Sequence, residues 1–329
     1  MQALTARLRA WLGDRPVPEA PRPVEPTTQE PLRPRVLLVV FDPPVPSRGG
    51  RRLTEVCGYQ DPLALTAGYV ADLAEVSGGY LQYDLVETLT LDELPRKADG
   101  YCYSADEFIR CWQRGAGWHE PDAVDYAAPL ARFDVAARVA QGELDELWLF
   151  GPPYAGFWES TMAGRGAYWC NSPPVAGVAC PRRFVVMGFN YERGVGEMLE
   201  NFGHRTESIL TRVYGTAPGQ PAPNPWARFS AYDQVAPGQA GCGTVHFAPN
   251  SVRDYDWGNR RSVWSTCDDW RRYPALSGER HQVDCREWGG GDIRAHHRWW
   301  LAHLPRAAGY HDGKLANWWT YAVDANAAG

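Results

Sequence analysis

A continuous apolar run, VLLVVFDPP at residues 36–44, constrains the fold of this chain more than any other feature. Valine and leucine without alternation are typical of a central strand that is covered on both faces, as in a parallel sheet. A helical pattern follows at residues 61–79, and residues 80–91 alternate like a second strand. Because parallel strands are joined by right-handed crossovers, this order predicts a β-α-β unit.

The alternation of strands and helices continues along the chain. A helix is predicted near residues 126–141 and a strand at residues 144–151, followed by a loop of Gly, Pro and aromatic residues. A third strand at residues 183–190 leads into a helical segment that ends near Gly215. We therefore predict an α/β fold with a mostly parallel central sheet flanked by helices, and a loop-rich, aromatic C-terminal cap.

The composition divides the chain into three parts. Residues 1–34 form an amphipathic segment, predicted to dock a protein partner, and a proline-rich linker. Residues 35–215 carry the α/β pattern, and residues 216–329 are rich in Pro, Gly, Asn, Asp and Trp. We expect this last part to be loop-rich and to pack on the core as the cap.

Charge and hydropathy exclude several classes of protein. The net charge of −6 lends no support to a nucleic-acid partner, and no apolar stretch is long enough to predict a membrane span. The N-terminus lacks the pattern of a secretory signal, which favours a cytoplasmic location. Eight cysteines without a C-x-x-C pair exclude a zinc ribbon. Loop-closing disulfides and free thiols both remain open.

The helical segment before Gly215 concentrates polar side chains on one face. Glu197, Glu200, His204 and Glu207 fall within a sector of about 80° on a helix. Carboxylates and an imidazole on one face can bind a divalent metal or share a proton, although the apolar opposite face also fits an ordinary surface helix. Gly203 indicates that the helix is interrupted, which would place His204 and Glu207 at a turn.

The local sequence GHRTES, residues 203–208, is similar to the H-x-x-E pair with which zinc carboxypeptidases supply two of three metal ligands. The resemblance implies that His204 and Glu207 bind zinc. That family's third histidine normally lies further along the chain than His246, so the likeness covers this pair alone. We predict His246 as the third ligand because it follows a strand-like run and precedes a turn. Asp254 and Asp256 are nearby carboxylates that could orient the imidazole or bind the ion.

Two further carboxylates follow predicted strands. Glu159 lies in the loop GPPYAGFWES after residues 144–151, and Glu192 lies in NYERG after residues 183–190. Ligands of open α/β sheets bind at the carboxyl ends of strands, so both are candidate catalytic acids or bases, or a glycosidase pair. Tryptophans in loops suit stacking on sugars, or clusters that hold the loops together.

These observations predict a metal-dependent hydrolase, with zinc as the favoured ion, acting on a peptide-like or glycan-like substrate at the rim of the sheet. Two alternatives stay open at this point. One is a glycoside hydrolase that uses two carboxylates, and the other is a non-catalytic module that binds glycans or proteins.

Overall fold

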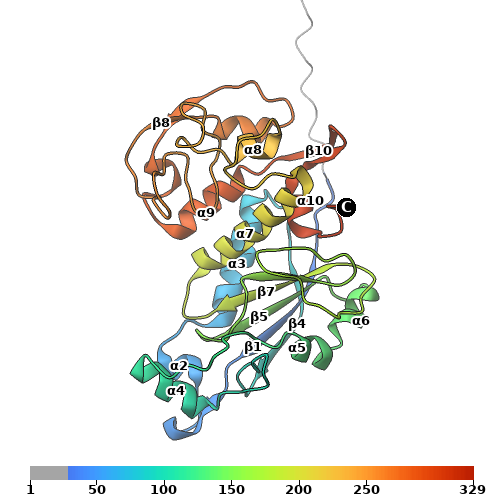
Figure 1. The fold of residues 1–329 in the computed structure, drawn as a ribbon, viewed down its shortest axis with the longest axis vertical. Coiled ribbons are helices and arrows are strands. Elements are labelled where there is room, and N and C mark those ends of the chain that lie inside the picture. Colours follow the sequence, from blue (N-terminus) through green and yellow to red (C-terminus); the bar gives the residue numbers. More distant parts are fainter. Residues whose placement is uncertain (1–28) are drawn as a thin grey trace, which may run out of the picture. The chain divides into compact units, whose positions relative to one another are not determined.

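The computed structural model describes residues 29–329 and has a central sheet of five strands in the order β4-β1-β5-β7-β6 (Figure 1). The strands are β1 (Arg35–Phe41), β4 (Asp84–Leu91), β5 (Glu146–Gly151), β6 (Ser160–Ala163) and β7 (Phe184–Asn190). β1 pairs in parallel with β4 and β5, and β5 pairs in parallel with β7, whereas β6 is antiparallel to β7. The predicted α/β fold with a mostly parallel sheet is thus confirmed.

Helices cover both faces of this sheet. α3 (Pro62–Val76) and α7 (Val195–Tyr214) pack on one face, and α5 (Ala127–Arg132) and α6 (Val135–Ala140) pack on the other. Alternate side chains of β1 enter these two layers, and all but its first residue are buried. Burial on both sides is the reason for the uninterrupted apolar run at this strand.

Two helical predictions differ from the structure. The single helix expected near residues 126–141 is two short helices, because Asp134 adopts a left-handed conformation with φ of 49° between them. α7, in contrast, runs without a break through Gly203. A Cβ atom at this position would lie 2.6 Å from Cγ2 of Val245, so the glycine permits the close approach of a loop to the helix.

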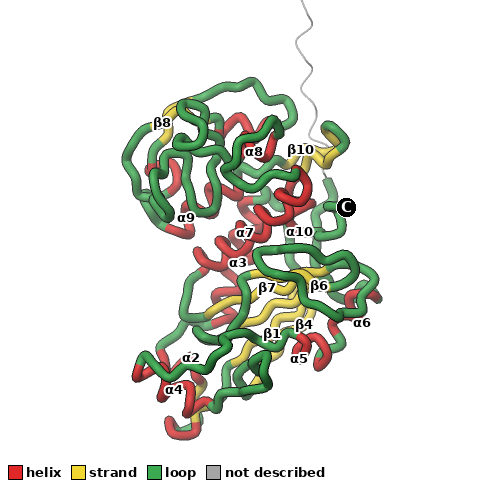
Figure 2. Tube along the Cα trace, viewed as in Figure 1, coloured by secondary structure: helices red, strands yellow, loops and turns green. Residues whose placement is uncertain are grey.

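Loops make up most of the C-terminal part, as Figure 2 shows. This part is held by an aromatic core more than by regular ladders. Its elements are α8 (Pro225–Phe229), β8 (Val263–Ser265), β9 (His281–Val283), α9 (Ile293–Ala302), β10 (Arg306–His311), β11 (Lys314–Asn317) and α10 (Trp318–Val323). Trp226, Trp270 and Trp318 are buried together around Phe229. α9 and α10 contact α7, which therefore lies between the sheet and this aromatic core.

Shorter elements complete the fold. They are β2 (Pro44–Val45), β3 (Arg51–Arg52), α2 (Leu53–Cys57), α4 (Ala105–Arg114) and 3-10 turns at Pro46–Arg48, Cys267–Arg272 and Cys285–Trp288. α2, α4 and β2 share a small hydrophobic cluster around Phe108 that is separate from the two layers of the sheet.

A buried ion pair fixes the rotation of α7 on the sheet. The Arg205 guanidinium donates to both carboxylate oxygens of Glu146 on β5, at 2.8 and 2.7 Å, and to the Val323 carbonyl at 2.8 Å. Successive side chains on a helix are about 100° apart. Anchoring Arg205 to the sheet therefore directs its neighbour His204 away from the sheet and towards the C-terminal part.

Several predictions concern the N-terminal segment and the cysteines. The amphipathic segment, its protein partner and most of the linker lie outside the described residues, and residues Pro31–Gly329 form one compact unit. All eight cysteines are among the described residues and are free thiols. No helix within residues 29–329 combines the length and the apolar composition needed to cross a membrane, as predicted.

Candidate metal centre

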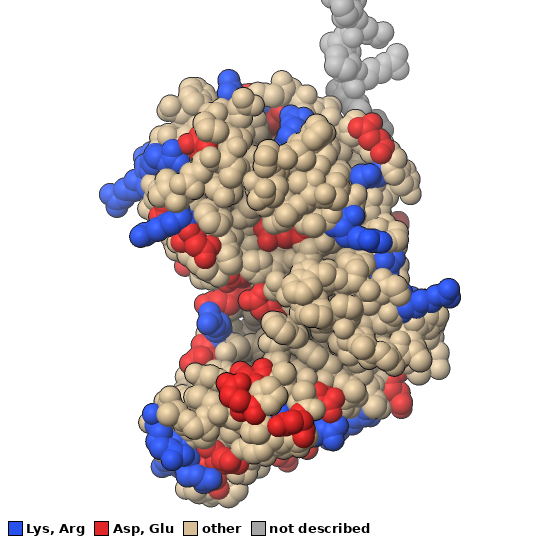
Figure 3. Space-filling view, in the orientation of Figure 1, with Lys and Arg blue, Asp and Glu red and all other residues tan. Residues whose placement is uncertain are grey.

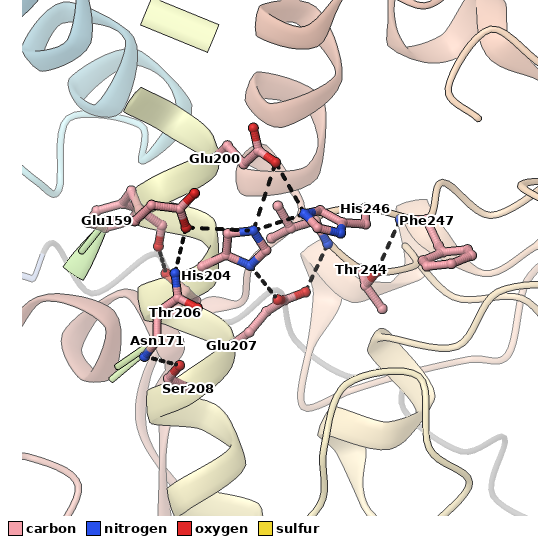
Figure 4. A network of polar contacts seen from close by, with 12 residues as sticks. Glu159, Asn171, Glu200, His204, Thr206, Glu207, Ser208, Thr244, His246 and Phe247 are labelled. Carbon is pink, nitrogen blue, oxygen red and sulfur yellow. Dashed lines mark hydrogen bonds and ion pairs between the residues drawn. The ribbon is translucent and has the colours of Figure 1, made fainter. Parts of the chain in front are cut away.

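Three side chains from two distant segments converge on one point above α7 (Figure 4). Glu200 and His204 are one helical turn apart, and His246 comes from the loop that approaches the helix at Gly203. The Nε2 atoms of His204 and His246 are 3.0 Å apart. Oε1 of Glu200 lies 3.1 Å from Nε2 of His246 and 3.8 Å from Nε2 of His204.

A carboxylate contacts the Nδ1 atom of each imidazole, on the side of the ring opposite the point of convergence. Nδ1 of His204 lies 3.2 Å from Oε2 of Glu207, and Nδ1 of His246 lies 3.0 Å from Oδ1 of Asp254. Glu207 also accepts a hydrogen bond of 2.8 Å from the Val245 backbone N–H, which ties the helix to the loop. A carboxylate on one ring nitrogen selects the tautomer whose other nitrogen is the ligand atom, as in histidine ligands of zinc.

The spacing of the three inward atoms fits a small cation. Ligand atoms about 2.0–2.1 Å from a tetrahedral zinc ion are about 3.3 Å from one another. The three separations in the structure, 3.0, 3.1 and 3.8 Å, lie on both sides of that value. Oε2 of Glu159 lies 4.0 Å from Nε2 of His204, so a further carboxylate stands beside the point where the three side chains converge. The same oxygen accepts a hydrogen bond from the side-chain amide of Asn171.

Burial and charged partners shift the pKa values of this cluster in opposite directions. Burial alone would lower the pKa of His204, but its contacts with Glu200 and Glu207 outweigh burial and raise the pKa to about 10. Burial would likewise raise the pKa of Glu200, whereas hydrogen bonds from His204, His246 and Tyr255 hold it well below its ordinary value. Four carboxylates surround two imidazoles, so a negative excess remains even when both rings are protonated.

The Tyr255 hydroxyl contacts two residues of the cluster. It donates to Oε1 of Glu200 at 2.7 Å and lies 2.9 Å from Nε2 of His246. The residue has a φ of 55°, a conformation that is costly for a side chain of this size and is often found at functional sites. Burial raises the pKa of this phenol, so the group stays a hydrogen-bond donor at neutral pH.

A cavity of about 410 Å³ opens beside the cluster, at the carboxyl ends of β5 and β7. Glu159, Glu200 and Tyr255 belong both to its wall and to the surroundings of the two histidines. Figure 3 shows a hollow on this face of the molecule with Asp and Glu side chains around it. The cluster can therefore be reached by a ligand from this rim of the sheet.

The structure brings together His204, Glu207 and His246, which were predicted as metal ligands, and Glu159, which was predicted as a catalytic carboxylate. Glu200 belongs to the same helical sector but was not among the predicted ligands, and its spacing of four residues from His204 was the signal that could have identified it. Asp254 contacts His246. Asp256 instead accepts hydrogen bonds from the Val252 backbone N–H and from the side-chain amide of Asn259, both in its own loop.

Glu192 is placed apart from the other predicted site residues. It is exposed at the end of β7, and its carboxylate forms no hydrogen bond or ion pair within residues 29–329. Glu159 belongs to the lining of the cavity beside the cluster, whereas Glu192 does not. The pairing of Glu159 with Glu192 stays a prediction.

A second group of potential ligands lies in the C-terminal part. Cys267, Asp268 and His303 each offer one atom within 4.8 Å of the others. Here, however, the Arg271 guanidinium lies 3.2 Å from Nε2 of His303, the ring atom that a metal would need, because Nδ1 faces the Trp299 carbonyl. This group is therefore satisfied by the protein itself.

A doubly wound sheet by itself indicates no function, because folds of this kind carry many unrelated sites. The histidine and carboxylate cluster and the cavity beside it are the features from which a function can be argued. Comparison of the chain with models of protein families, with curated proteins and with solved structures found no match.

Proposed function

We propose that this protein is a metal-dependent hydrolase that binds zinc, or a similar divalent cation, through Glu200, His204 and His246. The observation that carries the proposal is the contact of two Nε2 atoms at 3.0 Å while a carboxylate faces each Nδ1 atom. In the metal-free protein the raised pKa of His204 keeps a proton on its ring, and this proton can lie between the two Nε2 atoms. A divalent cation that binds both Nε2 atoms would take the place of that proton.

The proposal gives the carboxylates of α7 different roles. Glu200 supplies the third ligand atom, because its Oε1 faces the same point as both rings. Glu207 orients His204 instead of binding the ion, because its two oxygens are engaged by Nδ1 of His204 and by the Val245 N–H. Asp254 orients His246 in the same way. Such outer partners raise the basicity of a histidine ligand and fix its direction.

Zinc held by Glu200, His204 and His246 would lower the pKa of a water molecule and so supply a nucleophile at neutral pH. Glu159 is placed to accept the proton of such a water, because its carboxylate lies beside the cluster and 45% of the side chain is exposed. The Tyr255 hydroxyl donates its proton to Glu200, and its oxygen can accept a hydrogen bond from a substrate hydroxyl at the cavity wall. These roles support hydrolysis of a peptide-like or glycan-like substrate.

Metal content tests this proposal directly. The purified full chain is expected to contain about one divalent ion per molecule by elemental analysis. After chelation, zinc titration against a chromophoric chelator is expected to show one tight site. A chain that contains no stoichiometric metal and takes up none in the titration would refute the proposal.

Gly203→Ala is expected to weaken zinc binding by about 10–100-fold, the range found when the surroundings of a ligand are disturbed. The new methyl group would meet Cγ2 of Val245 at 2.6 Å and push the His246 loop away from the helix. Alanine favours a helix by about 1 kcal/mol over glycine, so the helix itself should not suffer. Competition titration and circular dichroism measure the two effects separately.

A second substitution provides the control for this prediction. Val245→Ala removes the atom that the new methyl group would meet, so the double variant Gly203→Ala with Val245→Ala is expected to recover most of the zinc affinity. If the double variant binds zinc as weakly as Gly203→Ala alone, displacement of the loop is not the cause.

The metal-free protein is expected to lose stability as the pH rises. The pKa of His204 is raised from 6.5 to about 10 in the fold, so its contribution is fully present below pH 6.5 and is lost as the pH passes through about 10. Urea unfolding of chelated wild type and of a His204→Asn variant, measured between these limits, should give a difference that shrinks with pH. A difference that does not change with pH contradicts the prediction.

A further inference from the structure

Two aromatic rings stand exposed at the wall of the cavity beside the candidate metal centre. Trp158 is 52% exposed and Tyr154 is 46% exposed, and both line the cavity. Within residues 29–329 the Trp158 indole has no ring contact and no hydrogen bond. Tyr154 stacks on Trp118 at 3.9 Å with one face only, which leaves its ring available at the cavity. Exposed rings of this kind suit contact with a ligand that has an apolar face.

The backbone that carries these rings is held by buried contacts. Tyr154 adopts a φ of 61°, and its carbonyl accepts a hydrogen bond of 2.5 Å from the ammonium of the buried Lys97. The backbone N–H of Trp158 donates to the Tyr126 hydroxyl at 2.7 Å, and its carbonyl packs so tightly on Gly188 that a Cβ there would lie 2.3 Å away. The wall is therefore formed before any ligand binds, which lowers the entropic cost of binding.

The polar groups of the cavity are mostly hydrogen-bond acceptors. They are the carboxylates of Asp122, Glu159, Glu197 and Glu200 and the amide oxygen of Asn201, whose NH₂ group donates to the Gly188 carbonyl. Arg193 is the one basic residue of the lining among the described residues. Asp122 is paired with the ammonium of Lys97, so three carboxylates remain against one guanidinium, and this excess of negative charge disfavours an acidic ligand. Hydroxyl groups, in contrast, donate readily to such acceptors.

We propose that this cavity binds a neutral, hydroxyl-rich sugar unit of a glycan, with its apolar face on Trp158 and its hydroxyls on the carboxylates. The inference rests on the proposed function and names its substrate class, because the sugar would lie against Glu159 and Glu200. The volume of about 410 Å³ suits one end of a short oligosaccharide and falls within the range of small-ligand pockets. The cavity lies at strand ends and offers no strand edge to extend a peptide.

Binding of neutral trisaccharides tests the inference on the full chain with zinc bound. The probes are cellotriose, maltotriose, xylotriose and the trimer of N-acetylglucosamine, with trialanine and inorganic phosphate for comparison. At least one trisaccharide is expected to change tryptophan fluorescence saturably. Trp158→Ala should weaken that binding by about 10-fold or more, as expected for loss of a stacking contact. Trp158→Phe should retain part of the affinity.

Trp264 offers a matched control, because it is 48% exposed but lies on β8 in the C-terminal part. Trp264→Ala should bind the trisaccharide like the wild type. Binding of none of the four sugars, binding of trialanine or phosphate in their place, or undiminished binding by Trp158→Ala would each overturn the sugar inference while leaving the metal proposal intact. A chain that binds the sugar through Trp158 but never takes up a metal overturns the hydrolase and supports the sugar site.

Discussion

Arg205→Met is expected to lower the free energy of unfolding by about 3–5 kcal/mol, the cost of leaving one member of a buried ion pair without its partner. Arg205 is fully buried and Glu146 is 1% exposed. Without the guanidinium, Glu146 keeps only the hydrogen bonds from the Trp148 indole and the Tyr83 hydroxyl, at 2.9 and 3.1 Å. The Val323 carbonyl also loses its donor. Urea unfolding followed by fluorescence measures the change.

Two further variants make this prediction specific. Arg205→Met combined with Glu146→Gln removes both charges. The amide oxygen can accept from the Trp148 indole while the amide NH₂ donates to the Tyr83 hydroxyl, so the double variant should recover much of the lost stability. Arg253→Met replaces an arginine that is 82% exposed and should change stability by less than about 1 kcal/mol. If Arg205→Met is as mild as the Arg253 variant, the buried pair does not anchor α7.

His246→Ala is expected to weaken zinc binding on the order of 1,000-fold or more, beyond the about 10–100-fold cost of losing an outer partner of a ligand. The substitution removes one of three ligand atoms, and the ring it removes is the one that links the loop to Glu200 and His204. The side chain is 29% exposed, so its loss should leave the fold intact. Competition against chelators of graded affinity measures the change.

Two further variants serve as comparisons for this experiment: one changes the carboxylate that contacts His246, and the other changes a distant histidine. Asp254→Asn keeps the ring but weakens its partner, so an intermediate loss of about 10–100-fold is expected. His311→Ala alters a side chain that is 40% exposed on β10 and should bind zinc like the wild type. Equal affinities for His246→Ala and His311→Ala would exclude His246 from the ligand set.

The main features of the fold could be predicted because local periodicity carries them. The uninterrupted run at β1 predicted a strand covered on both faces, and α3, α5 and α6 indeed bury both sides of it. The break at Asp134 was missed, because a left-handed residue between two helices leaves little trace in hydropathy. Trp226 and Trp270 are buried in the aromatic core, which is the packing role predicted for some of the tryptophans, whereas Trp158 is exposed.

The sequence by itself determined that Glu200, His204 and Glu207 share one face of a helix, because helical geometry places residues three and four apart side by side. Only the tertiary structure decided that this face is buried, that His246 meets His204 across 42 residues of chain, and that Glu207 faces Nδ1 of the ring. The physical reason is the contact of Val245 with Gly203, a packing relation between distant segments that no local pattern records. The same glycine, taken alone, predicted the end of a helix.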